Sequence, residues 1–352
     1  MKNIYKSFFA ILLSAILVLP VVSFAGNKDR SGQAGASELL INPWARSSGW
    51  GGVNISNSTG LESMYTNIAG LAFTQKTELI FSHTQWLKGS DININTFGLA
   101  QKAGDAGVLG IGVMSLRFGD IPITTTNLPD GGIGNFTPNY LNINLAYAKA
   151  FSNSIYGGFN FKVISESISN LSATGVAIDA GIQYVTGEKE NVKFGISLKN
   201  IGPTMKFRGD GYSVSSFLPG NDNGKFTLEH RAADFELPSQ LNIGMSYRFI
   251  MSEVHSLTLA GAFISNSFYK DQYALGAEYE LKNYLMLRAG YVYEDGITDN
   301  TKRTTVFTGP SAGFSIQVPL NKEKGSIFSI DYSYRATDPF SGSQTLAARL
   351  SF

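Results

Sequence analysis

The chain has 352 residues, contains no cysteine and carries a formal net charge of +1. The near-neutral charge gives no basic surface for nucleic acid, and the absence of cysteine excludes a disulfide framework and thiol chemistry. Its 38 glycines, 24 phenylalanines and 16 tyrosines are typical of crowded strands bordered by aromatic girdles.

The first residues have the pattern of a secretory signal peptide. Two lysines precede an apolar run from Phe8 to Val22, and Ser23-Phe24-Ala25 supplies a small-x-small cleavage site. We therefore expect residues 1–25 to be removed on export. No later apolar stretch is long enough for a transmembrane helix.

Residues 26–77 are rich in Gly, Ser and Asn and contain few alternating stretches. Four apolar residues recur at helical spacing within residues 60–71, which predicts a helix there. We expect Thr59 to cap the start of this helix and Gly70 to end it. We interpret residues 26–77 as a periplasmic segment or one that plugs the barrel mouth.

From residue 78 onward the hydrophobic pattern has a period of two. Leu145 and Tyr147, for example, lie on the opposite strand face from Asn144 and Ala146. Outward apolar and inward polar residues over about ten positions are typical of membrane β-barrels. The predicted strands are 78–87, 91–103, 106–119, 138–151, 154–168, 172–187, 192–202, 237–250, 255–266, 271–282, 284–294, 306–320, 327–336 and 341–352. Residues 78–352 are therefore predicted to form an all-β fold, a transmembrane antiparallel β-barrel of about 14 strands.

Connection lengths favour a membrane barrel over a soluble sandwich. The three longest connections, 120–137, 203–236 and 295–305, all follow odd-numbered strands, whereas the connections after even-numbered strands are short. Outer-membrane barrels have long outer loops and short periplasmic turns. We therefore expect a bacterial outer-membrane protein, and Phe352, at the end of an alternating strand, resembles the terminal aromatic insertion signal of such barrels.

Six ionisable residues fall on the polar faces of their predicted strands. They are Arg248, Glu278, Arg288, Asp331, Arg335 and Arg349. An Arg or Lys that faces lipid near the midplane costs about 2–4 kcal/mol, so these side chains are expected to face inward. We interpret them as a salt-bridged network that fills the lumen; a selectivity ring for a conducted solute is the alternative.

The long loops contain apolar residues among charges of both signs. Those in loop 203–236 are Phe207, Tyr212, Phe217, Leu218 and Phe226, and those in loop 120–137 include Leu128 and Phe136. A loop of this length is usually functional or disordered, and the aromatic residues argue against disorder. We therefore expect these residues to form a packed cap over the barrel or a surface that binds a protein partner.

The sequence gives no strong signal for catalysis, a cofactor or a metal. His83, His230 and His255 lie on different predicted elements and no two have ligand spacing. No nucleophile elbow, Walker loop or dinucleotide fingerprint occurs in the required context. The run at 221–224 lacks the glutamate that closes an EF-hand. We expect no catalytic residue, no cofactor and no metal, and hence a protein that is not an enzyme.

Two motifs and a strand end resemble a known family. The stretch Ala45–Gly52 (ARSSGWGG), with Arg46, Gly49, Gly51 and Gly52, precedes NIAGLA, with Asn67, Gly70 and Leu71. This order resembles the N-terminal signature of the PorV/PorQ family, a Gly-rich AR-x-x-G-x-GG run followed by NPAGLA. The stretch LKNIGP, with Asn200, Gly202 and Pro203, is similar to a strand end of that family. Ile68 stands where the family has proline, which predicts a continuous helix in place of a turn.

The resemblance implies a fatty-acid-transporter-like barrel in the type IX protein secretion system. Its implied partners are the C-terminal signal domains of secreted cargo, the large translocon barrel or attachment-complex proteins, bound through outer loops, with outer-membrane lipid around the wall. The residues alone leave two alternatives. One is a transporter of hydrophobic small molecules, with an apolar pocket and a lateral opening at a kink in the Gly-rich strand 106–119. The other is a structural barrel without a ligand.

Overall fold

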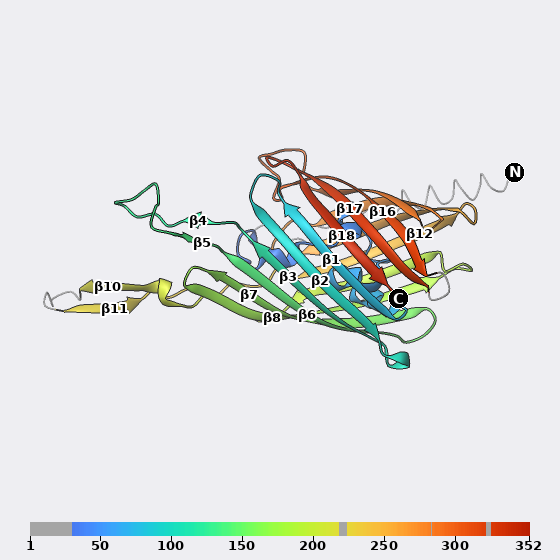
Figure 1. Ribbon diagram of the computed structural model, residues 1–352, viewed down its shortest axis with the longest axis horizontal. Helices are drawn as coiled ribbons and strands as arrows, with labels where there is room; N and C mark the ends of the chain where they lie inside the picture. The colour runs from blue at the N-terminus through green and yellow to red at the C-terminus, as the bar shows by residue number, and fades with distance from the viewer. Residues whose placement is uncertain (1–29, 218–223, 283, 322–324) are drawn as a thin grey trace.

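The computed structural model describes residues 30–217, 224–282, 284–321 and 325–352. The predicted signal peptide and Leu218 lie outside these residues. Fourteen antiparallel strands form a closed barrel in which β1 pairs with β18 (Figure 1). They are β1 (Thr77–Trp86), β2 (Ile92–Lys102), β3 (Val108–Arg117), β6 (Asn139–Ala150), β7 (Ile155–Ile168), β8 (Leu171–Thr186), β9 (Val192–Ile201), β12 (Gln240–Ile250), β13 (His255–Asn266), β14 (Gln272–Leu281), β15 (Leu285–Glu294), β16 (Phe307–Asn321), β17 (Ser326–Thr337) and β18 (Ser343–Ser351).

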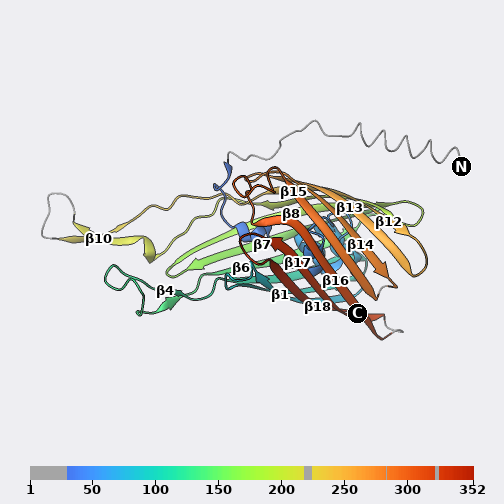
Figure 2. The ribbon, with the colours of Figure 1, turned by 90° about the horizontal axis from the view of Figure 1, so that it is seen from above.

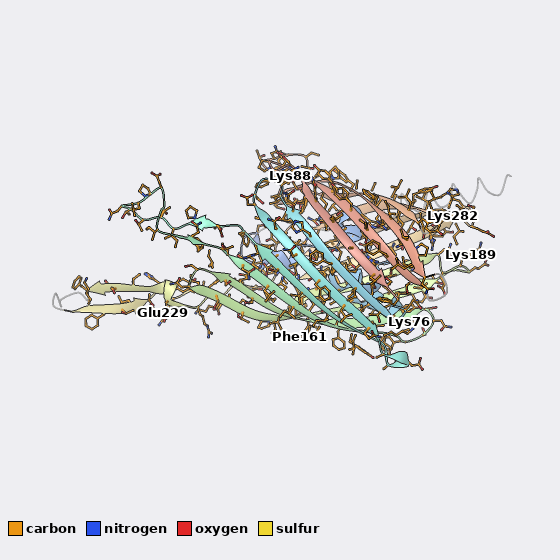
Figure 3. All side chains as sticks on the ribbon, viewed as in Figure 1. Lys76, Lys88, Phe161, Lys189, Glu229 and Lys282 are labelled. Atoms are coloured by element: carbon orange, nitrogen blue, oxygen red, sulfur yellow. The ribbon has the colours of Figure 1, made fainter. Side chains whose placement is uncertain are left out.

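The predicted fold class is confirmed, and every predicted strand is present with ends shifted by a few residues. The two-residue period separates the outer from the inner surface: Leu145 is 49% exposed, whereas the neighbouring Asn144 is 1% exposed. Phe161 of β7 likewise points away from the barrel (Figure 3). Closure of the sheet satisfies the backbone groups of every barrel strand, which lipid cannot do.

The long connections lie at one end of the barrel (Figures 1 and 2). The β3–β6 connection contains the two-stranded β4 (Ile121–Pro122) and β5 (Asn135–Phe136). The β9–β12 connection contains η6 (Asp210–Tyr212) and a hairpin of β10 (Ser213–Phe217) and β11 (Lys225–Glu229). Both project beyond the wall. We call this the long-loop end and the opposite one, with η5 (Gly104–Ala106) and the C-terminus, the turn end.

Residues 30–76 form a segment that we call the plug, and most of residues 34–74 are buried inside the barrel (Figure 2). Its elements are η2 (Ser37–Leu40), α2 (Ala45–Gly49), η3 (Gly60–Tyr65) and η4 (Ile68–Phe73). Trp44 and Leu61 are fully buried and pack against inward wall residues that include Ile94 and Met114. None of the helices in the described part of the chain is long and apolar enough to cross a membrane.

The predicted helix over 60–71 is wrong, as is the continuous helix expected from Ile68. Two 3-10 helices occur instead, and Thr59 makes no side-chain cap. Asn67 separates them because its side chain accepts a hydrogen bond from Ala69 N–H and donates to Ile55 O at 3.0 Å. A few apolar residues spaced by three or four do not distinguish a 3-10 pair from one helix.

Inward-facing glycines of the wall make room for the plug. A Cβ on Gly290 would lie 2.2 Å from Trp50 O, and one on Gly195 would lie 2.4 Å from Ile55 O. A Cβ atom does not approach another heavy atom this closely, so the plug backbone occupies the space of the absent side chains. The other wall glycines in contact with the plug are Gly98, Gly110, Gly112, Gly181, Gly244, Gly276 and Gly313.

The expected kink in the Gly-rich third strand does not form. β3 pairs with both β2 and β6 at every position from Val108 to Arg117, without a register shift. Gly110 and Gly112 face plug residues, Met64 among them. The glycines in this strand therefore serve plug packing, and β3 opens no gap in the wall.

Candidate functional site

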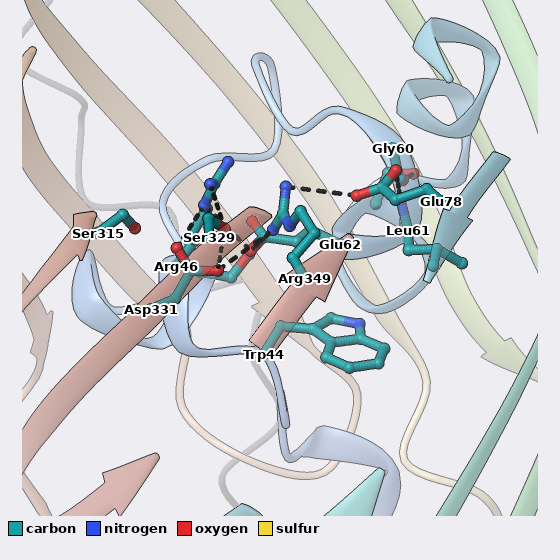
Figure 4. A network of polar contacts seen from close by, with 12 residues as sticks. Trp44, Arg46, Gly60, Leu61, Glu62, Glu78, Ser315, Ser329, Asp331 and Arg349 are labelled. Atoms are coloured by element: carbon teal, nitrogen blue, oxygen red, sulfur yellow. Dashed lines mark hydrogen bonds and ion pairs between the residues drawn. The ribbon is translucent and has the colours of Figure 1, made fainter. Parts of the chain in front are cut away.

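Five charged residues join the plug to the wall near the β1–β18 pairing (Figure 4). Arg46 of α2 donates from Nε to Asp331 Oδ1 of β17 at 2.9 Å. Arg349 of β18 donates to Glu62 of the plug and lies 3.4 Å, Nη1 to Oε1, from Glu78 of β1. All five side chains are largely buried. Buried charges are stable only when paired, so this network holds the plug in one position.

The remaining predicted lumen charges form separate contacts. Arg288 bonds to Glu278, Nε to Oε2, at 2.5 Å, and Arg248 bonds to Glu280, Nη2 to Oε2, at 2.5 Å. The Arg335 guanidinium lies over the Phe307 ring, 3.7 Å from its centroid. The structure thus divides the six predicted residues among four places, with only Asp331 and Arg349 in the plug network.

The sequence reasoning missed several members of these networks. Glu62 and Glu78 were not singled out, because their partners are distant in sequence. Lys162 of β7 also escaped notice; its Nζ lies 2.7 Å from Asp179 Oδ2 and donates to Asn200 Oδ1 at 2.7 Å. The sequence could have indicated Lys162, because this residue falls at an inward-facing position of its alternating strand.

The family-like residues lie mainly at the plug–wall contact. A Cβ on Gly49 would lie 3.1 Å from Gly313 Cα, and Gly51 and Gly52 have φ of 71° and 81°. Only glycine adopts such φ values without strain. In the plug, Gly70 faces Ser58 O, Leu71 is fully buried, and the Asn67 side chain donates to Ile55 O. In the wall, the Asn200 N–H donates to Asp179, and Gly202 lies against Val176 O. Pro203 is exposed beyond the end of β9.

Plug residues 50–57 separate cavities at the two ends of the lumen. A cavity of about 190 Å³ toward the long-loop end is lined in part by Lys199, Glu294 and Arg335. A cavity of about 230 Å³ toward the turn end is lined by polar and charged residues such as Lys193 and Glu278. Sites for drug-sized apolar ligands are typically larger, about 300–1,000 Å³, and mostly apolar. These cavities fit water and small polar solutes better.

The β10–β11 hairpin has one apolar face. Its register pairs Val214 with Leu228 and Ser216 with Phe226, so these side chains share a face. The three apolar ones are 41–42% exposed. The opposite face carries Ser215 paired with Thr227 and Ser213 paired with Glu229, and also Phe217 paired with Lys225. The hairpin projects beyond the barrel wall (Figure 3), and Val214, Phe226 and Leu228 on its first face are exposed.

The predicted partner-binding residues fall into three groups. Phe217, Phe226 and Leu128 are exposed on the projections. Tyr212 and Phe136 are half-buried. Phe207 packs against Phe235 at the hairpin base, with ring centroids 5.7 Å apart, and is less available. The sequence reasoning missed Val214 and Leu228, whose alternation in a long loop was the signal that they form a strand.

The histidines lie apart in hydrogen bonds of their own. His83 Nδ1 lies 2.9 Å from Asn95 Oδ1, and His255 Nδ1 lies 2.6 Å from the Tyr279 hydroxyl. Within the described ranges, no group of three or more His, Cys, Asp or Glu side chains could hold a metal ion. Phe352 follows β18, is exposed and donates its backbone N–H to Thr77 O at 2.9 Å.

No family model and no curated protein matches the chain. Among solved structures, the toluene transporter TodX of Pseudomonas putida superimposes with a TM-score of 0.56 and 14% identity over 88% of this chain and 98% of TodX. The monoaromatic hydrocarbon channel CymD gives 0.52 and 12% over 89% of this chain and 98% of CymD. A Pseudomonas aeruginosa FadL homologue gives 0.50 and 12% over 87% and 97%.

At these identities the likeness concerns the fold alone, and the fold is a FadL-like barrel. Apolar side chains cover the outer surface of the closed sheet, with Leu275, Ile182 and Leu346 among the most exposed. A barrel of this architecture, with an apolar exterior and long loops at one end, is a protein of the bacterial outer membrane.

Proposed function

We propose that this protein is a non-enzymatic outer-membrane barrel that binds protein partners through its projecting outer hairpins. The exposed apolar face of the β10–β11 hairpin carries the proposal. Val214, Phe226 and Leu228 stand beyond the wall, where lipid does not cover them. Exposed contiguous apolar surface rimmed by polar residues marks an interaction site.

The plug supports a binding role over conduction. It is held by the Arg46–Asp331 and Arg349–Glu62 pairs and by close contact with wall glycines. β3 pairs with its neighbours throughout, so this strand offers no side exit. A closed lumen suits a scaffold that must not leak.

The finer proposal is a component of the type IX protein secretion system. It rests on the PorV/PorQ-like motif residues, among which Gly49, Asn67 and Gly70 lie where the plug meets the wall or folds on itself. The partners would then be C-terminal signal domains of secreted cargo, the large translocon barrel or attachment-complex proteins.

The test replaces residues 213–229 with a short Gly-Ser linker in the tagged protein. A pull-down from native outer membranes in mild detergent, followed by mass spectrometry, should recover secreted proteins with a shared C-terminal domain, or a very large barrel, with the intact protein only. The control replaces η5 (Gly104–Ala106), a turn at the opposite end of the barrel, with a linker of the same kind. Equal recovery with and without residues 213–229 would contradict the proposal.

Transport of hydrophobic small molecules is the second candidate, and the fold likeness to TodX and CymD favours it. The test measures toluene and long-chain fatty acid uptake in cells with and without the protein, and lipid that co-purifies with it. Uptake that depends on the protein, and that survives loss of residues 213–229, would favour transport over partner binding.

A further inference from the structure

A second contact between plug and wall consists of oxygen ligands without a cation. Glu38 of η2 meets Glu166 of β7 and Asn142 of β6, and the three side chains are 2%, 3% and 2% exposed. No Lys, Arg or His among the described residues lies within ion-pair distance of either carboxylate. Tyr140 of β6 is the other ionisable side chain that lies close enough to interact electrostatically with both carboxylates.

Four buried oxygens of this cluster have no hydrogen-bond donor among the described residues. They are both carboxylate oxygens of Glu38, Oε1 of Glu166 and Oδ1 of Asn142. Ionised carboxylates and amide oxygens only accept, so they cannot satisfy one another. Buried polar atoms normally have partners, and a buried unpaired carboxylate is strongly unfavourable.

A proton shared between Glu38 and Glu166, together with the Asn142 amide group donating to Glu38, still leaves Asn142 Oδ1 without a partner. A cation among the four oxygens satisfies all of them and offsets the charge of both carboxylates. Carboxylate and amide oxygens are the ligands that hard divalent cations prefer.

We propose that Glu38, Glu166 and Asn142 bind one hard divalent cation of the Ca²⁺ or Mg²⁺ class, with water completing the coordination. The site joins residues 30–40 of the plug to the wall strands β6 and β7. It does not depend on what the outer hairpins bind.

The cation site would also order the base of the β10–β11 hairpin. Gly35 N–H donates to Glu236 O at 3.1 Å, and Arg30 forms an ion pair with Glu236. Ala36 and Leu39 pack with Met205 and Leu237 of the β9–β12 connection in one apolar cluster. Residues 30–40 therefore lie between the cluster of oxygens and the hairpin base, and fixing them fixes that base.

The test is calorimetric titration of Ca²⁺, and separately Mg²⁺, into chelator-treated full-length protein at pH 7.5. We expect one site per chain, and binding weakened by about tenfold or more in the double variant Glu38→Gln with Glu166→Gln. Asn142→Asp adds ligand charge and should tighten binding. Glu229→Gln, which removes an exposed carboxylate of the hairpin, is the matched control and should change nothing.

The pH dependence gives a second readout. Protons compete with the cation for the carboxylate oxygens, so Ca²⁺ affinity should rise as the pH is raised. Heat-modifiable mobility on gels establishes that each variant barrel is folded. The proposal is overturned if the folded wild type binds neither cation at pH 9, or if the double variant binds as tightly as the wild type.

Discussion

Arg349 shows how one side chain can hold two parts of the molecule together. Its guanidinium serves Glu62 of the plug and Glu78 of the first strand, and it lies 3.9 Å, Nη2 to Oδ2, from Asp331. Its rigid fork of donors matches several carboxylates at once, which a lysine does not do. The plug network therefore depends on this arginine more than on any other residue that it contains.

Replacing Arg349 with Gln should loosen the plug, because Glu62 and Glu78 lose their buried counter-charge. Breaking a buried ion pair in this way costs about 3–5 kcal/mol. Urea unfolding followed by tryptophan fluorescence measures the loss, since Trp44 and Trp50 lie in the plug.

Lys206→Gln is the control for Arg349→Gln. Lys206 and its partner Asp234 are 39% and 60% exposed, so the loss should be only about 0–1 kcal/mol. Equal losses in the two variants would show that the plug network contributes no special stability.

At the scale of elements, the plug and the wall fit together because the wall strands have no side chains where the plug backbone approaches them. The strands contribute glycines where the plug contributes backbone, as at Gly290 against Trp50. An interior at close-packed density transmits any added volume to its neighbours. The wall glycines are thus as important to closure of the lumen as the charged network.

Gly290→Ala should displace the Trp50 backbone and open a path between the two lumen cavities. Overpacking of this kind costs about 1–3 kcal/mol. Planar-bilayer recordings should show ion-conducting steps for the variant and none for the wild type. Gly261→Ala is the control, because a Cβ there lies 3.5 Å from Leu275 Cδ2 and 4.0 Å from Ala274 O, both ordinary contacts, and faces outward. A silent Gly290 variant would argue against glycine packing as the seal.

The two faces of the β10–β11 hairpin should differ in partner binding. Phe226→Ser with Leu228→Ser removes the apolar face and should reduce partner recovery by about tenfold or more, as expected for central apolar contacts. Ser215→Ala with Thr227→Ala alters the opposite face and should leave recovery unchanged. Both hairpin variants leave the barrel wall untouched, and equal effects would indicate that the apolar face is not the contact surface.

At the scale of the whole molecule, the sequence predicted the wall far better than its contents. The strand at 241–250 could be predicted from the sequence, because lipid requires apolar side chains and the lumen accepts polar ones on alternate residues. Plug residues such as Gly51 and Asn67 follow no period, since positive φ values and long-range hydrogen bonds set their positions. Glu78 and Glu62, the two glutamates that pair with Arg349, lie 271 and 287 residues away from it along the chain (349 − 78 and 349 − 62). No local sequence pattern can therefore reveal these pairs.

The orientation of the barrel can be tested cleanly because the chain has no cysteine. Thr227→Cys places a thiol on the hairpin, and Ser252→Cys places one in a short turn at the opposite end. A membrane-impermeant maleimide should label Thr227→Cys in intact cells and label Ser252→Cys only after the outer membrane is permeabilised. The reverse pattern would show that the hairpins face the periplasm.

The position of the charged network at the β1–β18 pairing bears on how the molecule is assembled. Glu62 and Glu78 belong to the first part of the chain, whereas Arg349 is close to its end. The Arg349 guanidinium reaches both carboxylates only when the first and last strands pair with each other. The plug is therefore enclosed in the same step in which the wall closes. A barrel that closes without the plug inside lacks the contacts that seal its lumen.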